Sequence, residues 1–280
     1  MQGHADRYRT FRALHDQHGC FVVANAWDVG SARVLSALGF AALATTSAGY
    51  AFAAGKRDSS GTLSRAELLD NAATIAAATD LPVTGDLEDG FGPDPATCAD
   101  TIRLASQAGL VGGSIEDATG DPAAPIHDFA LAVERVRAAA EAARDLPMVL
   151  TARADNFLWG RPDLADTIRR LQAFAEAGAH VLYAPGLPDL DAIRTVCGAV
   201  DRPVNVVAGL RATSPSVAAL AAAGVRRVSV GGSFFRAAFG AFRRAAEEVL
   251  RQGTFGYAAD AIPDAEIAAL MADARPATRT

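Results

Sequence analysis

Short apolar segments rich in β-forming residues alternate with alanine-rich helical segments along almost the whole chain. This alternation predicts parallel strands joined by helices. The predicted strands are Phe21–Asn25, Ala41–Thr46, Pro82–Glu88, Val111–Glu116, Met148–Arg153, His180–Ala184, Val204–Ala208 and Arg227–Gly231. The helices predicted between them are Ser31–Leu38, Ser64–Ala78, Pro95–Ala108, Ile126–Ala143, Pro162–Ala177, Asp189–Cys197 and Ser214–Ala223.

Eight strand–helix units predict a closed (β/α)8 barrel of the TIM type, which typically takes about 250 residues. An open doubly wound sheet is the alternative fold. We expect an additional helix within residues 1–20 and further helices within residues 235–274. Because no low-complexity linker interrupts the pattern, residues 1–280 are expected to form a single barrel domain.

Composition narrows the class of partner. The net charge is −6 and no basic run is present, which argues against nucleic acid. No apolar run approaches the roughly 18 residues of a membrane span, and the start of the chain does not resemble a signal peptide. Cys20, Cys98 and Cys197 lie far apart, which disfavours a disulfide framework and fits a reducing cytoplasm.

Acidic residues gather where the third predicted strand ends, in Thr84-Gly85-Asp86-Leu87-Glu88-Asp89. Strand alternation places Asp86 and Glu88 on one face, about 7 Å apart, and Leu87 on the other. Two carboxylates on one wall repel each other unless a cation or an arginine lies near them. The segment therefore predicts a cation site at this strand end.

Other strand ends supply matching polar residues. The active site of such a barrel lies at the C-terminal ends of its strands. Glu116 ends strand four and Arg153 ends strand five, and Asn205, in strand seven, is expected to help bind the substrate. We therefore expect Asp86, Glu88, Glu116 and Arg153 to converge at one mouth of the barrel.

The expected chemistry is that of a hard cation and a small acid. Carboxylates and water suit Mg²⁺ or Mn²⁺, and such an ion polarises a 2-oxo acid and stabilises an enolate. Arg153 is the natural bidentate partner of the substrate carboxylate, whose other side would meet Ser47 and the N–H groups of Ala48 and Gly49. The alternative is that the carboxylates and the arginine only neutralise one another.

Several nearby polar residues have competing interpretations. Asp89 and Asp117 are expected to face away from Asp86, which favours supporting or capping roles. A turn or cap role also competes at Asp58, which lies in a loop. His127 belongs to no motif, so a structural role is favoured there.

Together these segments resemble the isocitrate lyase / phosphoenolpyruvate mutase superfamily. The resemblance covers most of the chain, from Asn25 to Gly231. The segments that carry it are Thr46-Ser47-Ala48-Gly49, Gly55-Lys56-Arg57-Asp58, Gly85-Asp86-Leu87-Glu88-Asp89-Gly90-Phe91-Gly92, Ser114-Ile115-Glu116-Asp117 and Thr151-Ala152-Arg153-Ala154-Asp155. Each segment alone is a weak signal, but their order at successive strand ends is specific.

The resemblance implies a Mg²⁺-dependent enzyme that acts on a 2-oxo or 2-hydroxy acid through an enolate-like intermediate. It implies that Asp86 contacts the metal directly, whereas Asp58, Glu88 and Glu116 hold the waters of the metal. The implied carboxylate-binding residues are Ser47, Ala48, Gly49 and Arg153. Members are typically tetramers that often exchange their eighth helix, so a homo-oligomer (a dimer of dimers) with a swapped helix at residues 235–252 is expected.

The loop after strand four departs from the lyases of this superfamily. Isocitrate and methylisocitrate lyases carry Lys-Lys-Cys-Gly-His there, whereas residues 118–127 of this chain contain neither cysteine nor lysine. The general acid of those two reactions is therefore missing. The loop also offers little positive charge, which disfavours phosphorus–carbon chemistry.

Three functions remain open. The first is a carbon–carbon lyase, most simply a decarboxylase of an oxaloacetate- or 2-oxoglutarate-like acid, which needs the metal, Arg153 and a proton from water or Tyr50. The second is a hydrolase of a carbon–carbon or phosphorus–carbon bond, or a phosphonomutase. The third is a catalytically weak protein that binds 2-oxo acids.

Overall fold

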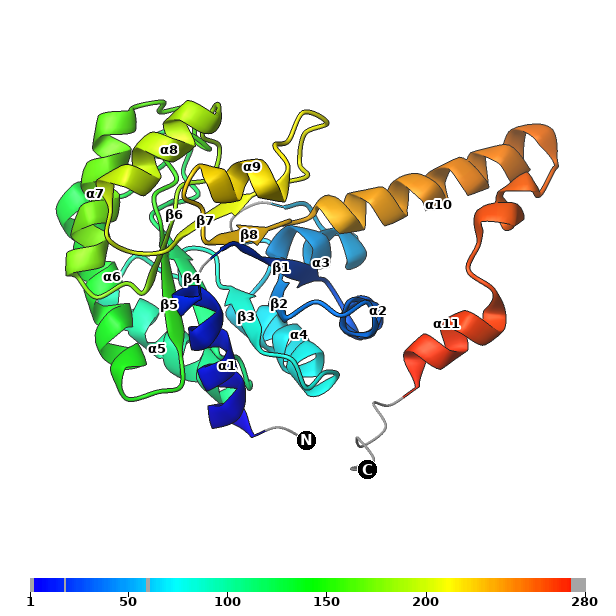
Figure 1. The fold of residues 1–280 in the computed structure, drawn as a ribbon, viewed down its shortest axis with the longest axis horizontal. Coiled ribbons are helices and arrows are strands. Elements are labelled where there is room, and N and C mark those ends of the chain that lie inside the picture. The colour runs from blue at the N-terminus through cyan, green and yellow to red at the C-terminus, as the bar shows by residue number, and fades with distance from the viewer. Residues whose placement is uncertain (1–2, 18, 59–60, 273–280) are drawn as a thin grey trace.

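Eight parallel strands form a closed barrel in this computed structural model, which describes residues 3–17, 19–58 and 61–272 (Figure 1). The strands are β1 (Phe21–Ala26), β2 (Ala42–Thr45), β3 (Val83–Asp86), β4 (Gly112–Glu116), β5 (Val149–Arg153), β6 (Val181–Tyr183), β7 (Val204–Val207) and β8 (Arg227–Ser229). β1 pairs with both β2 and β8. The predicted (β/α)8 barrel is therefore confirmed, and the open sheet is excluded.

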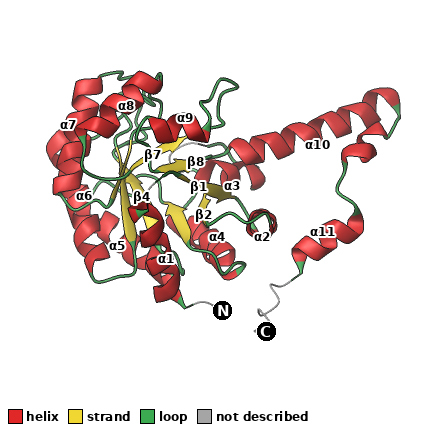
Figure 2. Ribbon diagram, viewed as in Figure 1, coloured by secondary structure: helices red, strands yellow, loops and turns green. Residues whose placement is uncertain are grey.

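Helices surround the strands, as Figure 2 shows. They are α1 (His4–Asp16), α2 (Val29–Ala37), α3 (Ser47–Ala53), α4 (Arg65–Ala77), α5 (Pro95–Gln107), α6 (Phe129–Arg144), α7 (Leu164–Glu176), α8 (Leu190–Ala199), α9 (Val217–Ala222), α10 (Ser233–Gln252), the 3-10 helix η1 (Gly256–Asp260) and α11 (Asp264–Met271). The sequence did not predict α3. This short helix forms because the Thr46 side chain caps it, accepting the Gly49 N–H at 3.2 Å.

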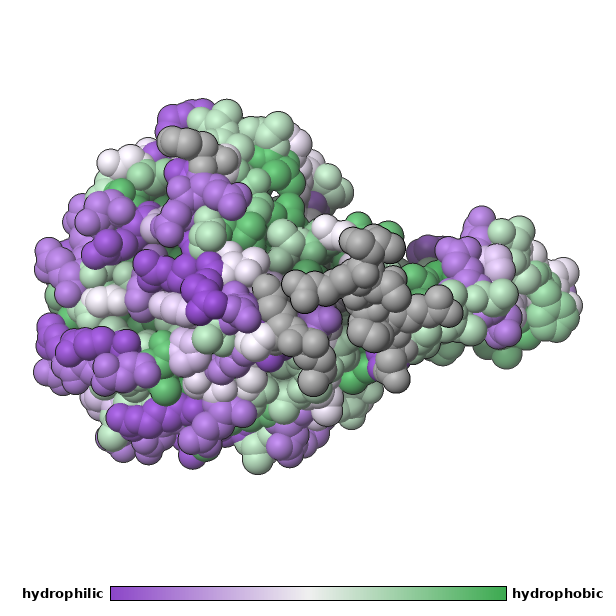
Figure 3. Space-filling model, turned by 60° about the horizontal axis from the view of Figure 1, so that its bottom comes forward, coloured by the Kyte–Doolittle hydropathy of each residue, from purple (hydrophilic) through white to green (hydrophobic). Residues whose placement is uncertain are grey.

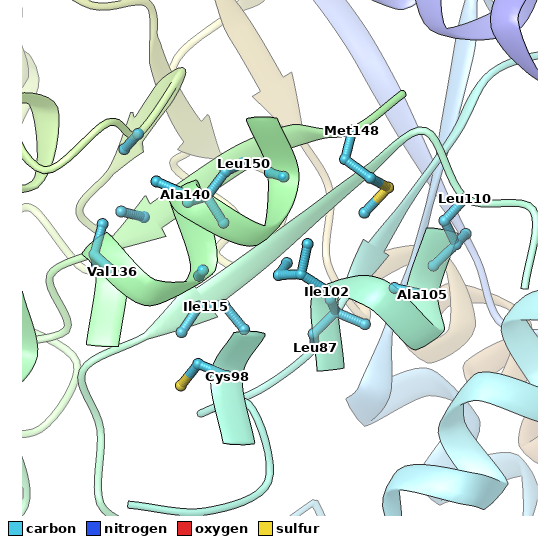
Figure 4. Close-up of a cluster of buried hydrophobic side chains, with 14 of the residues drawn as sticks. Leu87, Cys98, Ile102, Ala105, Leu110, Ile115, Val136, Ala140, Met148 and Leu150 are labelled. Atoms are coloured by element: carbon cyan, nitrogen blue, oxygen red, sulfur yellow. The ribbon is translucent and has the colours of Figure 1, made fainter. Parts of the chain in front are cut away.

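Leu87 anchors the turn that follows β3. Its side chain is fully buried among Ile102, Ile115 and their neighbours (Figure 4). A Cβ atom on Gly113 would lie only 2.5 Å from Leu87 Cδ1, so glycine at this position of β4 makes room for the leucine. The packing of Leu87 fixes the two acidic residues on either side of it, which are Asp86 and Glu88.

The C-terminal segment forms an arm outside the barrel. α10 runs away from the strands, and α11 returns toward α2, where Arg33 donates a hydrogen bond to the Met271 carbonyl (Figure 1). Figure 3 shows the arm projecting from the barrel. The helices predicted in residues 1–20 and 235–274 thus correspond to α1 and to α10 with α11, and their predicted ends at residues 1–2, 18 and 273–274 lie outside the described residues.

Two further expectations concern the chain as a whole. Cys20, Cys98 and Cys197 are all free thiols, in keeping with the absence of a predicted disulfide framework. In the part of the chain that the structure describes, no helix combines the length and the apolar character needed to span a bilayer.

Candidate active site

A cavity of about 1140 Å³ opens at the C-terminal ends of the barrel strands. It collects most of the residues that the sequence assigned to a site. Those that line it are Ser47, Ala48, Asp58, Asp86, Glu88, Glu116 and Arg153. Residues from α3, from the following loop and from the ends of three strands therefore meet at one place, as expected for the functional face of a barrel.

Arg153 lies at the centre of an ion-pair network. Its guanidinium contacts Glu116 Oε2 at 2.7 Å, Asp155 Oδ2 at 2.9 Å and Asp86 Oδ1 at 3.3 Å. The Tyr183 ring lies beneath the guanidinium, with 5.2 Å from its centroid to Arg153 Cζ. Although burial alone would lower the pKa of Arg153, the three carboxylates hold this pKa above its ordinary value.

Asp86 is fixed from both sides of its carboxylate. Its Oδ2 accepts hydrogen bonds from the Ser47 hydroxyl at 3.0 Å and from the Ser47 N–H at 3.2 Å, while its Oδ1 faces Arg153. The Asp86 N–H in turn donates to Thr45 Oγ1 at 2.9 Å. The carboxylate that ends β3 is therefore held in one orientation without being buried.

Glu88 reaches the cavity by a route that the sequence did not predict. β3 ends at Asp86, so strand alternation does not extend to Glu88. Glu88 has a φ of 49°, in the left-handed region that non-glycine residues seldom adopt. Buried Arg135 of α6 donates to the carbonyls of Asp89 and Gly92 and holds the turn in this form. The expected convergence of Asp86 and Glu88 is thus produced by a turn.

Negative charge exceeds positive charge in this part of the cavity. Five carboxylates surround the single guanidinium of Arg153: Asp58, Asp86, Glu88, Glu116 and Asp155. Burial raises the pKa of Glu88 to about 8, with help from the charges of Asp86, Asp89 and Asp58. Burial also raises the pKa of Glu116, and burial together with the charge of Asp86 raises that of Asp58. A bound cation would relieve this repulsion.

The donor set fits a hard divalent ion that keeps most of its waters. Within the described residues, no group of three or more acidic, histidine or cysteine side chains is close enough to hold a metal directly. Mg²⁺ commonly uses one or two protein carboxylates and retains several waters. The oxygen donors around Asp86 therefore fit Mg²⁺ or Mn²⁺ better than a zinc-like ion, which requires a closed set of ligands.

Asp117 supports the site from behind. It is buried and accepts the Asp155 N–H at 2.8 Å, while Arg170 Nη1 contacts it at 3.0 Å. Arg170 also donates to the His127 carbonyl at 3.0 Å, which ties down the end of the loop after β4. Asp89 forms a local turn through a 2.8 Å bond from the Phe91 N–H. The supporting role expected for Asp117 thus has direct partners, whereas Asp89, which was expected to face away, also lines the cavity.

Three residues assigned from the sequence do not line the cavity: Gly49, Tyr50 and Asn205. The Gly49 N–H is used by the Thr46 cap, so it is not available to a substrate carboxylate. Asn205 is buried inside the barrel, where it accepts from Arg227 Nε at 2.8 Å and donates to Ser229 Oγ at 3.0 Å. Asn205, a predicted substrate-binding residue, thus belongs to a deeper layer of the interior than the cavity lining.

Tyr183 is a site residue that the sequence analysis did not single out. It ends β6, lines the cavity and lies against Arg153. Burial raises the pKa of its hydroxyl above the ordinary value, so the group stays protonated at physiological pH. Its position at a strand end was the available signal, but tyrosine is also a common strand former, which hid it.

Comparison with known proteins matches this architecture. The sequence profile of the phosphoenolpyruvate phosphomutase family matches residues 11–250. An uncharacterised Mycobacterium tuberculosis protein is 34% identical over 246 residues, covering 86% of this chain and 88% of that protein. Oxaloacetate decarboxylase of Pseudomonas savastanoi is 30% identical, covering 73% and 71%. The crystal structure of a candidate lyase/mutase from Burkholderia cenocepacia is 54% identical, covers 96% of each chain and superposes with a TM-score of 0.93.

Proposed function

Because the chain belongs to the phosphoenolpyruvate phosphomutase family, within the isocitrate lyase / phosphoenolpyruvate mutase superfamily of lyases and mutases, we propose that it is a Mg²⁺-dependent carbon–carbon lyase of a small 2-oxo acid. The observation that carries the proposal is the surplus of carboxylates around Arg153 at the strand ends. The similarity to oxaloacetate decarboxylases supports a 2-oxo dicarboxylate as the substrate class.

Asp86 would hold the metal directly, since its carboxylate is oriented and partly open to the cavity. Asp58, Glu88 and Glu116 would hold it through waters, and Mn²⁺ could replace Mg²⁺ at such oxygen donors. The bound ion supplies positive charge that stabilises the negative charge developing on the 2-oxo oxygen.

The protein residues orient the acid for cleavage. Arg153 would bind the substrate carboxylate, and Ser47, with the N–H of Ala48, would face its other side. In a decarboxylation the bond between C3 and its carboxylate breaks, its electron pair forms an enolate with the 2-oxo group, and CO₂ leaves. The C3 carbon of the enolate then takes up a proton. The ring of Tyr183 lies against Arg153 and its hydroxyl stays protonated, so we assign this residue, in place of Tyr50, as the donor.

Lyase chemistry fits the cavity better than hydrolysis or phosphoryl transfer. The loop after β4 contributes Ala118 and Gly120 to the lining, and these residues offer neither a base nor a positive charge. Lys56 is engaged with Glu67 at 2.5 Å, outside the cavity lining. A phosphoryl group would need several cations beside the acidic residues, and Arg153 is the one cationic side chain that the described lining places there.

We also propose that the chain assembles as a homo-oligomer in which α10 packs against another copy. Phe235, Phe239 and Phe242 form a row of rings along α10, with centroids 4.3 and 5.7 Å apart. α10 is strongly amphipathic in sequence, yet these rings on its apolar face are left uncovered: Phe242 is 66% exposed and Phe239 is 48% exposed. Light scattering should give a mass of at least two chains, and Phe242→Asp should lower it. A monomeric wild-type protein would contradict this arrangement.

The test of the reaction is an assay of 2-oxo and 2-hydroxy acids with mass-spectrometric detection of products. The protein is first treated with a chelator, then assayed with and without added Mg²⁺. We expect Mg²⁺-dependent conversion of oxaloacetate or a related acid to the decarboxylated product, above the blank without enzyme. Acids that bind without forming a product would instead support the function of a 2-oxo acid binding protein.

A further inference from the structure

The cavity continues past the acidic residues into a part with apolar walls. Large hydrophobic side chains that are more than a third exposed line it: Phe52 (37%), Leu158 (53%), Trp159 (37%) and Leu210 (39%). They come from α3, from the loop between β5 and α7, and from the loop between β7 and α9. Exposed apolar groups that gather on one cavity indicate an apolar ligand.

Close backbone packing holds these walls in place. Gly186 adopts a φ of 84°, and a Cβ atom there would lie 3.2 Å from the Leu158 nitrogen. The loop after β6 therefore lies directly against the loop that carries Leu158. On the opposite side, a Cβ atom on Gly231 would lie 3.4 Å from Val207 and 3.8 Å from Leu210. The walls thus belong to the barrel loops that also carry the site.

The charged side chains that line this part of the cavity are exposed to solvent and not buried. The cationic lining residues besides Arg153 are Arg211 and Arg236, and both are exposed. Arg236 Nη1 donates to the Leu210 carbonyl at 3.3 Å. Of the acidic ones, Asp189 caps α8 and Asp191 is 91% exposed and paired with Arg194. A substrate group placed here would meet mainly carbon atoms.

The volume also exceeds the need of a four-carbon acid. Pockets of about 300–1,000 Å³ enclose drug-sized ligands, and this cavity measures about 1140 Å³. An oxaloacetate-like acid held between Asp86 and Arg153 would leave most of the apolar part empty. The small residues Ala118 and Gly120 of the loop after β4 add to this space.

We infer that the natural substrate carries an alkyl group of several carbons on C3, the carbon from which the carboxylate is lost, and that this group occupies the apolar part of the cavity. The inference rests on the proposed lyase function and specifies the substrate class of that site. Each methylene that is buried on binding is expected to raise kcat/KM about fourfold.

The experiment compares oxaloacetate with its 3-methyl, 3-ethyl and 3-propyl derivatives, in the presence of Mg²⁺ and against blanks without enzyme. We expect kcat/KM to rise about fourfold per added carbon, to a total of about 60-fold for propyl. Leu158→Asp should remove this rise and leave oxaloacetate turnover within about twofold. The control is Leu38→Asp, on α2 outside the cavity lining, where Leu38 is 70% exposed; it should keep the full rise.

Failure of the inference and failure of the proposed function have different signatures. A flat or falling series with clear turnover of oxaloacetate would overturn the alkyl group and leave the lyase intact. If no acid is turned over, the lyase assignment fails, and calorimetry with unreactive alkylmalonates decides the inference. Affinity that rises with chain length would then support the apolar subsite, and equal affinity would overturn it.

Discussion

The two ends of the barrel interior each contain an arginine, in opposite surroundings. At the C-terminal mouth, Arg153 lies among carboxylates. At the other end, Arg227 contacts neutral groups: Asn205 Oδ1 at 2.8 Å, Thr151 Oγ1 at 2.9 Å and His15 Nε2 at 3.4 Å. Burial lowers the pKa of Arg227 to about 10, whereas the carboxylates hold that of Arg153 above its ordinary value.

The difference separates a structural end from a functional one. Because arginine only donates, His15 Nε2 must accept, so its Nδ1 carries the proton donated to the Phe11 carbonyl at 2.8 Å. Every partner of Arg227 is thus a neutral, enclosed group that ties β5, β7, β8 and α1 together. At the mouth, by contrast, negative charges are unbalanced and open to the cavity. This arrangement favours the binding of a cation, and with it an anionic substrate, and does not stabilise the fold.

The largest expected effect concerns the metal-facing residue at the mouth. Asp86→Ala should lower Mg²⁺-dependent kcat about 10³-fold or more, since charge stabilisation by a metal is worth several kcal/mol. Its free energy of unfolding should change by less than about 1 kcal/mol, because the substitution also removes repulsion. Steady-state kinetics and urea unfolding measure both quantities. The control, Asp191→Ala, removes an exposed carboxylate, and equal activity of both variants would argue against the assignment of Asp86.

The opposite pattern is expected at the closed end. Arg227→Met should lower the free energy of unfolding by about 2–4 kcal/mol, because it leaves buried acceptors unpaired. The kcat of the folded protein should stay within about twofold of the wild type, as Arg227 lies outside the cavity lining. Arg226→Met is the matched control, since Arg226 donates only to exposed carbonyls. A kcat of the folded variant that falls well beyond this twofold range would break the division between the two ends.

Acid should destabilise the closed end through His15. Burial lowers the pKa of His15 to about 3, and the charges of Arg227, Arg12 and His180 act in the same direction. A depressed folded-state pKa means that the stabilisation is complete above about pH 6.5 and is lost as the pH falls from there toward 3. The loss at pH 5 should be about 2 kcal/mol. Unfolding of His15→Gln at pH 7.5 and 5 should show a correspondingly smaller difference, and an unchanged difference would contradict the role of His15.

The smallest effect sharpens the picture of the mouth. Glu88→Gln should weaken Mg²⁺ affinity about tenfold, the scale for residues that act on a metal indirectly. The free energy of unfolding should not fall, because burial and the neighbouring carboxylates already disfavour the charged form of Glu88, as its raised pKa shows, and glutamine is an uncharged group of the same size. Calorimetric titration with Mg²⁺ measures the first quantity and thermal unfolding the second. A clear loss of stability would show that Glu88 is held by favourable contacts instead.

Most of the fold could be predicted because strand and helix signals alternate without interruption. Each of the eight strands was placed within about two residues of its observed ends. α3 escaped because Gly49 suggests a turn. Gly49 packs so closely against its surroundings that a Cβ atom on it would lie 3.1 Å from Trp27 Cβ. Only the folded chain reveals this contact.

The site was predictable where a residue ends a strand, as Asp86, Glu116 and Arg153 do. Strand alternation gives the inward direction of a side chain but not its depth, which is why Asn205 was assigned to the mouth. Asp58 lies in a loop and was identified through family resemblance alone. Glu88 depends on a left-handed turn, which no periodicity in the sequence reports.

Binding of Mn²⁺, followed by the loss of its free electron paramagnetic resonance signal, tests the central claim most directly. The account predicts one Mn²⁺ bound per chain in the wild type and in Asp191→Ala, displaced by Mg²⁺, and none in Asp86→Ala at the same concentrations. A wild-type protein that leaves all Mn²⁺ free, or an Asp86→Ala variant that binds it equally well, would contradict the claim that the acidic mouth is built around a divalent cation.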